Sequence, residues 1–290
     1  RNQWGTALGM AGVMAMALIH QSVRHRHKRG VIFWTAATAL FTGAVMANGS
    51  RGGFLVLVGG GSAYWMFFGL ARKNYRYVAV AVSFLLVAFA VFSLGGGQLL
   101  ERFVSLRQTV EGGGDADFRL QFYRMTRVML ADAPLTGFGL GNFEYVLPFY
   151  LDFAPAFNRR PVHPESSFLW LANEGGWLSV AAVGVAFGMV ILLGLGARRS
   201  RATTIRSAGL ACALMLVFNA FFEVSGHRLG TLFPAIFLAS LALPAAGSQT
   251  LAPKVAALAR AASAVLLLAG ISWIMSAWGK PMLPAMQGTL

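Results

Sequence analysis

The stretch FLWLANEGGWLSVAAVGVAFGMVILLGL, residues 168–195, decides the fold of this chain. Its only charged residue is Glu174, and about 20 mostly apolar residues are enough to cross the hydrocarbon core of a bilayer. Backbone polar groups in lipid must be satisfied within the segment, so the stretch predicts a transmembrane helix. The period-2 alternation of a membrane β-barrel is absent here and in the other apolar runs.

Seven further apolar runs have the same character. The eight predicted spans are residues 4–22, 31–47, 54–71, 77–94, 168–195, 207–224, 229–244 and 261–279. The composition agrees, because 57% of the 290 residues are hydrophobic, the mean hydropathy is +0.62 and only 12% are charged. Soluble domains have about 25% charged residues. We therefore expect an all-α polytopic membrane protein with about eight transmembrane helices, and a water-soluble or disordered chain is excluded.

The predicted spans divide the chain into three parts. Residues 1–94 hold the first four spans, residues 95–165 form one large extracytoplasmic loop, and residues 166–290 hold the last four spans and a C-terminal tail. The first apolar run is not a signal peptide, because its basic cluster follows it. The chain begins at Arg1 rather than Met, so we expect an N-terminal portion to be missing. The single cysteine excludes a disulfide framework and a cysteine-based metal site.

The formal net charge of +14 is largely a topology signal. Alternate connections carry thirteen basic residues and no acids: Arg24, Arg26, Lys28, Arg29, Arg72, Lys73, Arg76, Arg198, Arg199, Arg201, Arg206, Lys254 and Arg260. On the other side, the only basic residues of the short connections are Arg51 and Arg228, and the tail holds Lys280. By the positive-inside rule the first set is cytoplasmic. These loops are too short to build a basic surface for nucleic acid, so no nucleic-acid partner is expected.

The 71-residue loop 95–165 contains eight of the ten acidic residues of the chain and seven arginines. A loop of this length is usually functional or disordered. Glycine runs at 95–97 and 112–114 suggest hinges around an ordered piece.

One segment of this loop has a helical period. Its apolar face consists of Phe118, Phe122, Met125 and Met129. The other side of the same helix holds Arg119, Arg124 and Arg127, and Asp117 stands at its start. We expect this amphipathic helix to lie on the helix bundle or on the membrane surface. Its arginines would then face either a water-filled site or the lipid headgroups.

Arg51 and His163 are the leading candidates for chemistry. Arg51 follows the second span in NGSRGG, residues 48–53. An arginine at membrane depth costs about 2.5–3.5 kcal/mol and marks function, whereas one that snorkels to the interface costs little. His163 lies in VHPESSF, residues 162–168. Its imidazole can act as a general base near neutral pH, or it can be a hydrogen-bonded loop histidine.

Four further polar residues are candidates for supporting roles. Glu165 and Glu174 can orient the imidazole or an arginine, or cap the helix that starts near Ser166. His227 and Arg228 form a polar pair between the sixth and seventh spans, where they line the same outer site or simply build a short connection.

The glycine-rich segment GFGLGN, residues 137–142, is interpreted as a tight turn after Pro134. No strand precedes it, so a dinucleotide site is excluded.

These motifs together resemble the bacterial O-antigen ligase and polymerase superfamily. The resemblance is carried by NGSRGG (48–53), RLQFYR (119–124), DAPLTGFGLGNF (132–143) and HPESSFLWLANEGG (163–176). It favours an O-antigen ligase, because the Ser-Arg-Gly and double-arginine features recur in ligases. Pro164 departs from the asparagine that often follows the histidine. Family members have about a dozen spans, which fits the missing N-terminal portion.

The resemblance implies a glycosyltransferase similar in fold to other polytopic enzymes that use lipid-linked glycans (GT-C-like). The donor would be a glycan on undecaprenyl pyrophosphate and the acceptor a sugar of the lipid A core, at the periplasmic face of the bacterial inner membrane. Transfer would need no cofactor or metal and would invert the anomeric carbon. Carried over to this chain, the resemblance puts the donor pyrophosphate on Arg51, Arg119 and Arg124, and gives the acceptor proton to His163.

Three alternatives stay open. A polymerase of the same superfamily would pass the glycan to another lipid-linked repeat unit. A transporter or flippase would bind an anionic lipid-linked glycan without chemistry, but such proteins usually show internal repeats and charges near the midplane, which this sequence lacks. A purely structural subunit would leave the placement of the arginines and the histidine unexplained.

Overall fold

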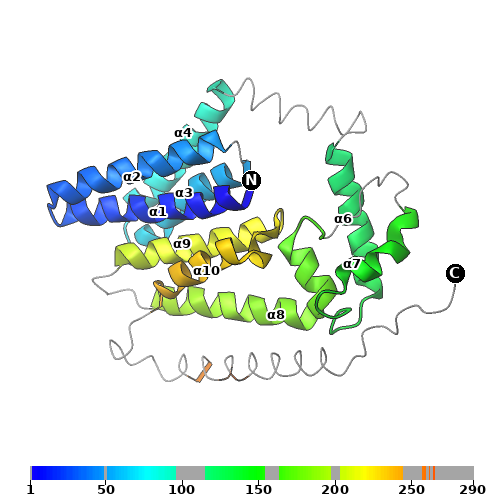
Figure 1. Cartoon of the computed structure of the whole chain (residues 1–290). Coiled ribbons are helices and arrows are strands. Elements are labelled where there is room, and N and C mark those ends of the chain that lie inside the picture. The colour runs from blue at the N-terminus through cyan, green and yellow to red at the C-terminus, as the bar shows by residue number, and fades with distance from the viewer. Residues whose placement is uncertain are drawn as a thin grey trace. The chain divides into compact units, whose positions relative to one another are not determined.

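The computed structural model describes residues 2–48, 51–95, 115–153, 163–196 and 203–243, and the isolated positions 257, 258, 261 and 264. Every regular element in these residues is a helix (Figure 1). The chain forms two compact units. One consists of Arg1–Asp117 with Val190–Thr250, and the other of Phe118–Met189 with Leu251–Leu290.

Five helical stretches are long and apolar enough to cross a membrane. They are Trp4–Arg24 in α1 (Asn2–Arg24), α2 (Lys28–Ala47), Gly53–Arg72 in α3 (Arg51–Arg72), Ser167–Leu195 in α8 (Ser167–Gly196) and α9 (Thr203–Ala220). Shorter apolar segments lie at Tyr75–Leu86 in α4 (Tyr75–Gly95) and at Gly230–Ser240 in α10 (Leu229–Ser240). The eighth predicted span, 261–279, lies almost entirely outside the described residues. The prediction of an all-α, multi-pass membrane protein is confirmed.

The sixth predicted span, 207–224, is shifted from the helix that forms there. Helix α9 begins at Thr203 and ends at Ala220, and residues Val224–His227 form a separate 3-10 helix, η2. Arg206 was expected to lie outside the span because of its charge. Its side chain is instead 6% exposed within the second turn of α9. A span predicted from hydropathy ends at a charged residue, whereas the observed helix includes Arg206 and buries its side chain.

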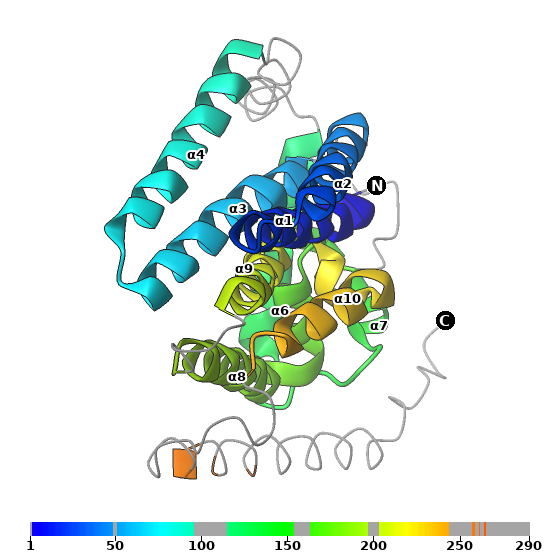
Figure 2. The same ribbon diagram turned by 90° about the vertical axis from the view of Figure 1, so that its left-hand side faces the viewer.

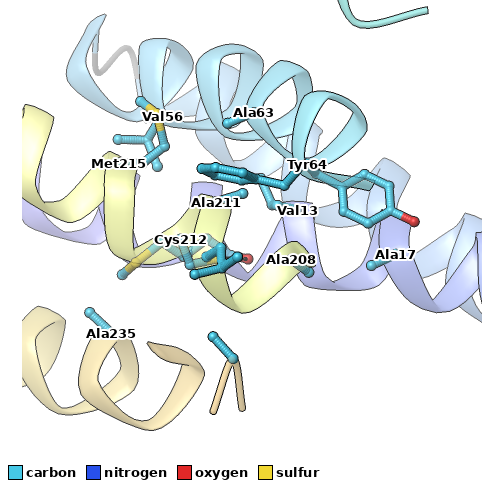
Figure 3. Packing of buried hydrophobic residues seen from close by; sticks show 14 residues of the cluster. Val13, Ala17, Val56, Ala63, Tyr64, Ala208, Ala211, Cys212, Met215 and Ala235 are labelled. Carbon is cyan, nitrogen blue, oxygen red and sulfur yellow. Dashed lines mark hydrogen bonds between the residues drawn. The ribbon is translucent and has the colours of Figure 1, made fainter. Parts of the chain in front are cut away.

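In the first unit, α1, α3, α9 and α10 pack around one apolar core (Figure 3). Val13 of α1, Tyr64 of α3 and Met215 of α9 are all buried in it. The helices approach closely where side chains are small, so that a Cβ on Gly53 would meet the backbone of Gly5. Such contacts between small residues are typical of helices packed in lipid.

The basic turns of the first unit lie at one end of it. Helices α1 and α2 form one antiparallel hairpin, and α3 and α4 form another (Figure 2). His20 Nδ1 lies 2.5 Å from the hydroxyl of Tyr64, and its ring contacts Phe68 edge-on at 4.6 Å. Arg24 lies four residues after His20, and Arg72 lies four residues after Phe68. The α1–α2 and α3–α4 connections therefore lie at the same end of the unit, as the positive-inside assignment requires.

The second unit is built around α6 (Asp115–Asp132). Its other described elements are α7 (Phe143–Val146), the 3-10 helix η1 (Leu147–Phe153) and the first part of α8. The predicted amphipathic helix is confirmed, and it begins two residues before Asp117. Its apolar face is buried within the unit, where Phe122, Met125 and Met129 pack against Phe143 of α7 and Trp170 of α8. The contact with α8 agrees with the expectation of a helix lying on the bundle, and the cover by α7 was not expected.

Candidate functional site

Arg124 and Arg127 of α6 lie on the face opposite its buried stripe. Phe122 and Met129 are 0% exposed, and Met125 is 2% exposed. The helical repeat therefore turns Arg124 and Arg127 outward, and both side chains are exposed. They are three residues apart, so they neighbour each other on the helix surface. Arg119 lies on the same helix, where only its backbone is described.

The glycine-rich turn docks against a break in α8. Helix α8 is interrupted at Gly176, which has φ 69° and ψ −177°. The N–H groups of Phe138 and Gly139 donate to the carbonyls of Asn173 and Glu174 at 2.8 and 2.9 Å. In an unbroken helix these carbonyls would accept hydrogen bonds from N–H groups one turn further along. The turn therefore replaces helical hydrogen bonds, and it fixes the loop after α6 against α8.

Two glycines make this approach possible. Gly137 and Gly176 both have positive φ, which L side chains adopt only with strain. A Cβ on Gly137 would collide with the carbonyl of Glu174, and one on Gly176 with the carbonyl of Leu135. The interpretation of residues 137–142 as a tight turn is confirmed, since the N–H of Gly137 donates to the carbonyl of Pro134 at 2.7 Å.

Glu174 is 5% exposed, and its carboxylate reaches the start of α7. Its Oε1 accepts a hydrogen bond from the backbone N–H of Phe143 at 3.2 Å. Within the described residues this carboxylate contacts neither His163 nor an arginine. Helix α8 is capped by another residue, because Ser166 Oγ accepts from the N–H of Leu169 at 3.3 Å.

His163 lies just before α8, with its ring 5.6 Å from that of Trp170 and tilted by 30°. Its buried Nδ1 faces Glu165, whose Oε1 is 3.6 Å away. The histidine and glutamate side chains are 21% and 29% exposed, respectively. Glu165 adopts φ 52°, a left-handed conformation that turns its side chain back toward His163.

Three candidates lie in the first unit. Arg51 is the first residue of α3, and only its backbone is described. His227 is the half-buried last residue of η2, and Arg228 is the exposed N-cap of α10. The structure thus brings His163 and Glu165 together within the second unit, which also carries Arg119 and Arg124.

Sequence reasoning missed Asn173 and Trp170. Asn173 is 0% exposed, and its Nδ2 donates to the carbonyl of Leu169 at 2.9 Å and to that of Thr126 in α6 at 3.5 Å. Trp170 lies between the His163 ring and the apolar core of α6. A buried asparagine and a tryptophan inside an apolar span were the available signals, because each needs a specific partner there.

The long apolar helices define a multi-pass membrane protein, and its second unit carries exposed arginines and a histidine that faces a glutamate. A family model described as O-antigen ligase matches residues 36–183, just over half of the chain. The chain belongs to this family, whose members are ligases and polymerases acting on lipid-linked polysaccharide. The match includes Arg51, Arg119, Arg124, His163, Glu165 and Glu174, and it ends before His227 and Arg228. No curated protein matches the chain, and no solved structure does.

Proposed function

We propose that the chain is an O-antigen ligase of the bacterial inner membrane. It transfers a glycan from undecaprenyl pyrophosphate to a sugar hydroxyl of the lipid A core at the periplasmic face. The observation that carries this proposal is the geometry of His163, whose Nδ1 lies 3.6 Å from Glu165 Oε1. A carboxylate close to the ring favours the protonated imidazole that a general base becomes.

His163 acts as the general base in this reaction. Nε2 takes the proton of the acceptor hydroxyl as its oxygen attacks the anomeric carbon of the donor. The bond from that carbon to the pyrophosphate oxygen breaks, and undecaprenyl pyrophosphate leaves with the bonding electron pair. Attack from the face opposite the leaving group inverts the anomeric configuration. Glu165 stabilises the imidazolium that forms.

Arg124, Arg119 and Arg51 bind the donor pyrophosphate. Guanidinium groups match phosphate oxygens in bidentate geometry, and they stabilise the charge that develops on the leaving group. Arg124 is supported by its exposure on the α6 face opposite the buried stripe. Pyrophosphate is already a good leaving group, so charge stabilisation and one base suffice. His227 and Arg228 are proposed as further contacts to the glycan or the lipid.

The test is a transfer assay with the purified full chain in liposomes. The donor is a polysaccharide on undecaprenyl pyrophosphate, the acceptor is lipid A core, and the buffer contains EDTA. We expect a glycan ladder on the core, and a loss of about 10²- to 10⁴-fold in rate with His163→Ala. His25→Ala is the matched control, because His25 is an exposed histidine in the turn between α1 and α2.

Each other outcome assigns a different function or role. A ladder that survives His163→Ala would remove this residue as the base. Longer chains on the polyprenyl carrier, with the core untouched, would identify a polymerase. Donor binding that weakens with Arg124→Gln, without any covalent product, would indicate a transporter or flippase.

A further inference from the structure

The second unit contains a pocket of about 630 Å³ beside the arginine face of α6. Its walls include Arg127 and Leu130 of α6, Leu135 of the following loop, and Phe168, Leu169 and Trp177 of α8. The remaining lining residues are alanines, so Arg127 is the single charged group. This volume falls within the range of small-molecule binding sites, about 300–1,000 Å³.

The pocket is fixed by the same contacts that dock the glycine turn. The carbonyl of Leu135 accepts a hydrogen bond from the N–H of Leu178 at 3.4 Å, just past the break at Gly176. The loop wall is therefore attached to α8 by backbone hydrogen bonds. Even so, Leu135 is 69% exposed and Trp177 47% exposed. Large, partly exposed apolar side chains thus line the pocket, and a backbone hydrogen bond joins its loop wall to α8.

The lining combines one cation with apolar side chains. Arg127 is exposed on α6, and among the described residues no carboxylate pairs with it. Phe168 and Trp177 lie on either side of the break at Gly176 in α8, a helix long and apolar enough to cross a membrane. A ligand with an anionic head and an apolar tail matches a lining that has one cation and otherwise apolar side chains.

We propose that this pocket holds the first isoprene units of the donor lipid, with Arg127 as an additional pyrophosphate contact. This proposal rests on the function proposed above, because it takes the donor pyrophosphate to bind at Arg124. Arg127 follows Arg124 by three residues on the same exposed face, so a pyrophosphate bound at Arg124 lies next to Arg127, which also lines the pocket. Trp177 and Leu135 then contact the isoprenoid chain and select for it.

The test measures lipid binding and glycan transfer separately on the full chain in phosphatidylethanolamine nanodiscs. Binding is followed with labelled undecaprenyl pyrophosphate, and inorganic pyrophosphate and phosphatidylglycerol serve as competitors. We expect Trp177→Ala and Leu135→Ala each to weaken undecaprenyl pyrophosphate binding by up to about tenfold, with little change for inorganic pyrophosphate. Arg127→Gln should weaken both. Both apolar side chains are largely exposed, so neither substitution should unfold the unit.

Leu178→Ala is the matched control for Trp177→Ala. Leu178 is the next residue in α8 and is 50% exposed, but it does not line the pocket. Its substitution should change neither affinity. In the transfer assay, Trp177→Ala should raise KM about tenfold more for an undecaprenyl donor than for a geranyl donor, with kcat unchanged.

The remaining outcomes separate the two proposals. If binding follows this pattern but no glycan is transferred, the pocket stands and the proposed function fails. If transfer proceeds and Trp177→Ala acts no differently from Leu178→Ala, the pocket proposal is overturned. It is also overturned if phosphatidylglycerol displaces the label as well as unlabelled undecaprenyl pyrophosphate does, because an ordinary membrane lipid would then be the occupant.

Discussion

Glu174 accepts a hydrogen bond from the backbone N–H of Phe143 at 3.2 Å, and this contact joins two segments 31 residues apart. Glu174 lies in the apolar span α8, and Phe143 is the first residue of α7. The N–H groups at a helix start have no partner within the helix, and a carboxylate there also complements the helix dipole. The acid therefore tethers α7 to α8, and its position beside the histidine motif has a structural reason.

The first prediction concerns this tether. Glu174→Ala should lower the stability of the second unit by about 1–3 kcal/mol, because it leaves the N–H of Phe143 buried without a partner. Glu174→Gln keeps an oxygen acceptor and should retain most of the stability and the transfer activity. Melting temperatures in detergent and transfer rates test this pair. Loss of activity with Glu174→Gln at unchanged stability would instead give the charge a role in the reaction.

The second prediction concerns the glycine turn. Gly137→Ala and Gly176→Ala should each destabilise the unit by more than about 3 kcal/mol, because they combine backbone strain with a collision against a carbonyl. Gly141 has φ 73° but open space around its Cβ position. Gly141→Ala should therefore cost only the strain, about 1–2 kcal/mol. Yields of folded protein and melting temperatures would measure the difference, and equal effects at all three positions would count against a docked turn.

The third prediction concerns the partner of His163. Glu165→Gln removes the negative charge that faces Nδ1 at 3.6 Å. We expect kcat to fall about tenfold, less than with His163→Ala, since the base remains but its imidazolium is less stabilised. The KM for the donor should stay unchanged. Glu144→Gln, at an exposed acid of α7, is the control, and a matching loss there would point to a general effect of charge.

The fourth prediction concerns Tyr150 and Asp132. The hydroxyl of Tyr150 in η1 donates to Asp132 Oδ2 at the end of α6 at 2.9 Å. Burial, then this hydrogen bond and the negative charge of Asp132, raise the pKa of Tyr150 above its usual value. Tyr150→Phe should cost about 1 kcal/mol of stability at neutral pH.

The pH dependence has a definite sign. A raised pKa means that the folded unit holds the phenol proton more tightly than the unfolded chain does. The stabilisation is therefore fully present below the unfolded pKa of about 10, and it is lost as pH rises through the higher folded value. The melting temperatures of wild type and Tyr150→Phe should converge at alkaline pH. Tyr145→Phe, at a tyrosine that is 69% exposed, should show no such difference at any pH.

Much of the fold was predictable because its signals are local. Five of the predicted spans coincide with long apolar helices, since about 20 apolar residues must be helical to satisfy their backbone in lipid. The stripe of Phe122, Met125 and Met129 was equally readable from its period. The candidate base and arginines were found from motifs in which residue types stand close together in the chain.

What covers the stripe could not be predicted in this way. A helical period shows that a face is buried, and it does not name the partner. The sequence predicted a helix lying on the bundle or the membrane, but it did not show that Phe143, Val146 and Leu147 come from a later segment to cover that face. The contact of Asn173 could not be predicted either, because its carbonyl acceptor at Thr126 is 47 residues away in the chain.

The sequence by itself determined that this chain is an all-helical, multi-pass membrane protein with an arginine-bearing amphipathic helix and a histidine at the start of a span. Hydropathy and helical period suffice for this, because each depends only on neighbouring residues. The tertiary structure alone decided that the span 168–195 breaks at Gly176, that the glycine turn docks into the break, and that Glu174 supports α7 while Glu165 faces His163. Hydropathy carries no information about backbone conformation. The partner of a carboxylate depends on which groups the folded chain places within a few ångströms of it.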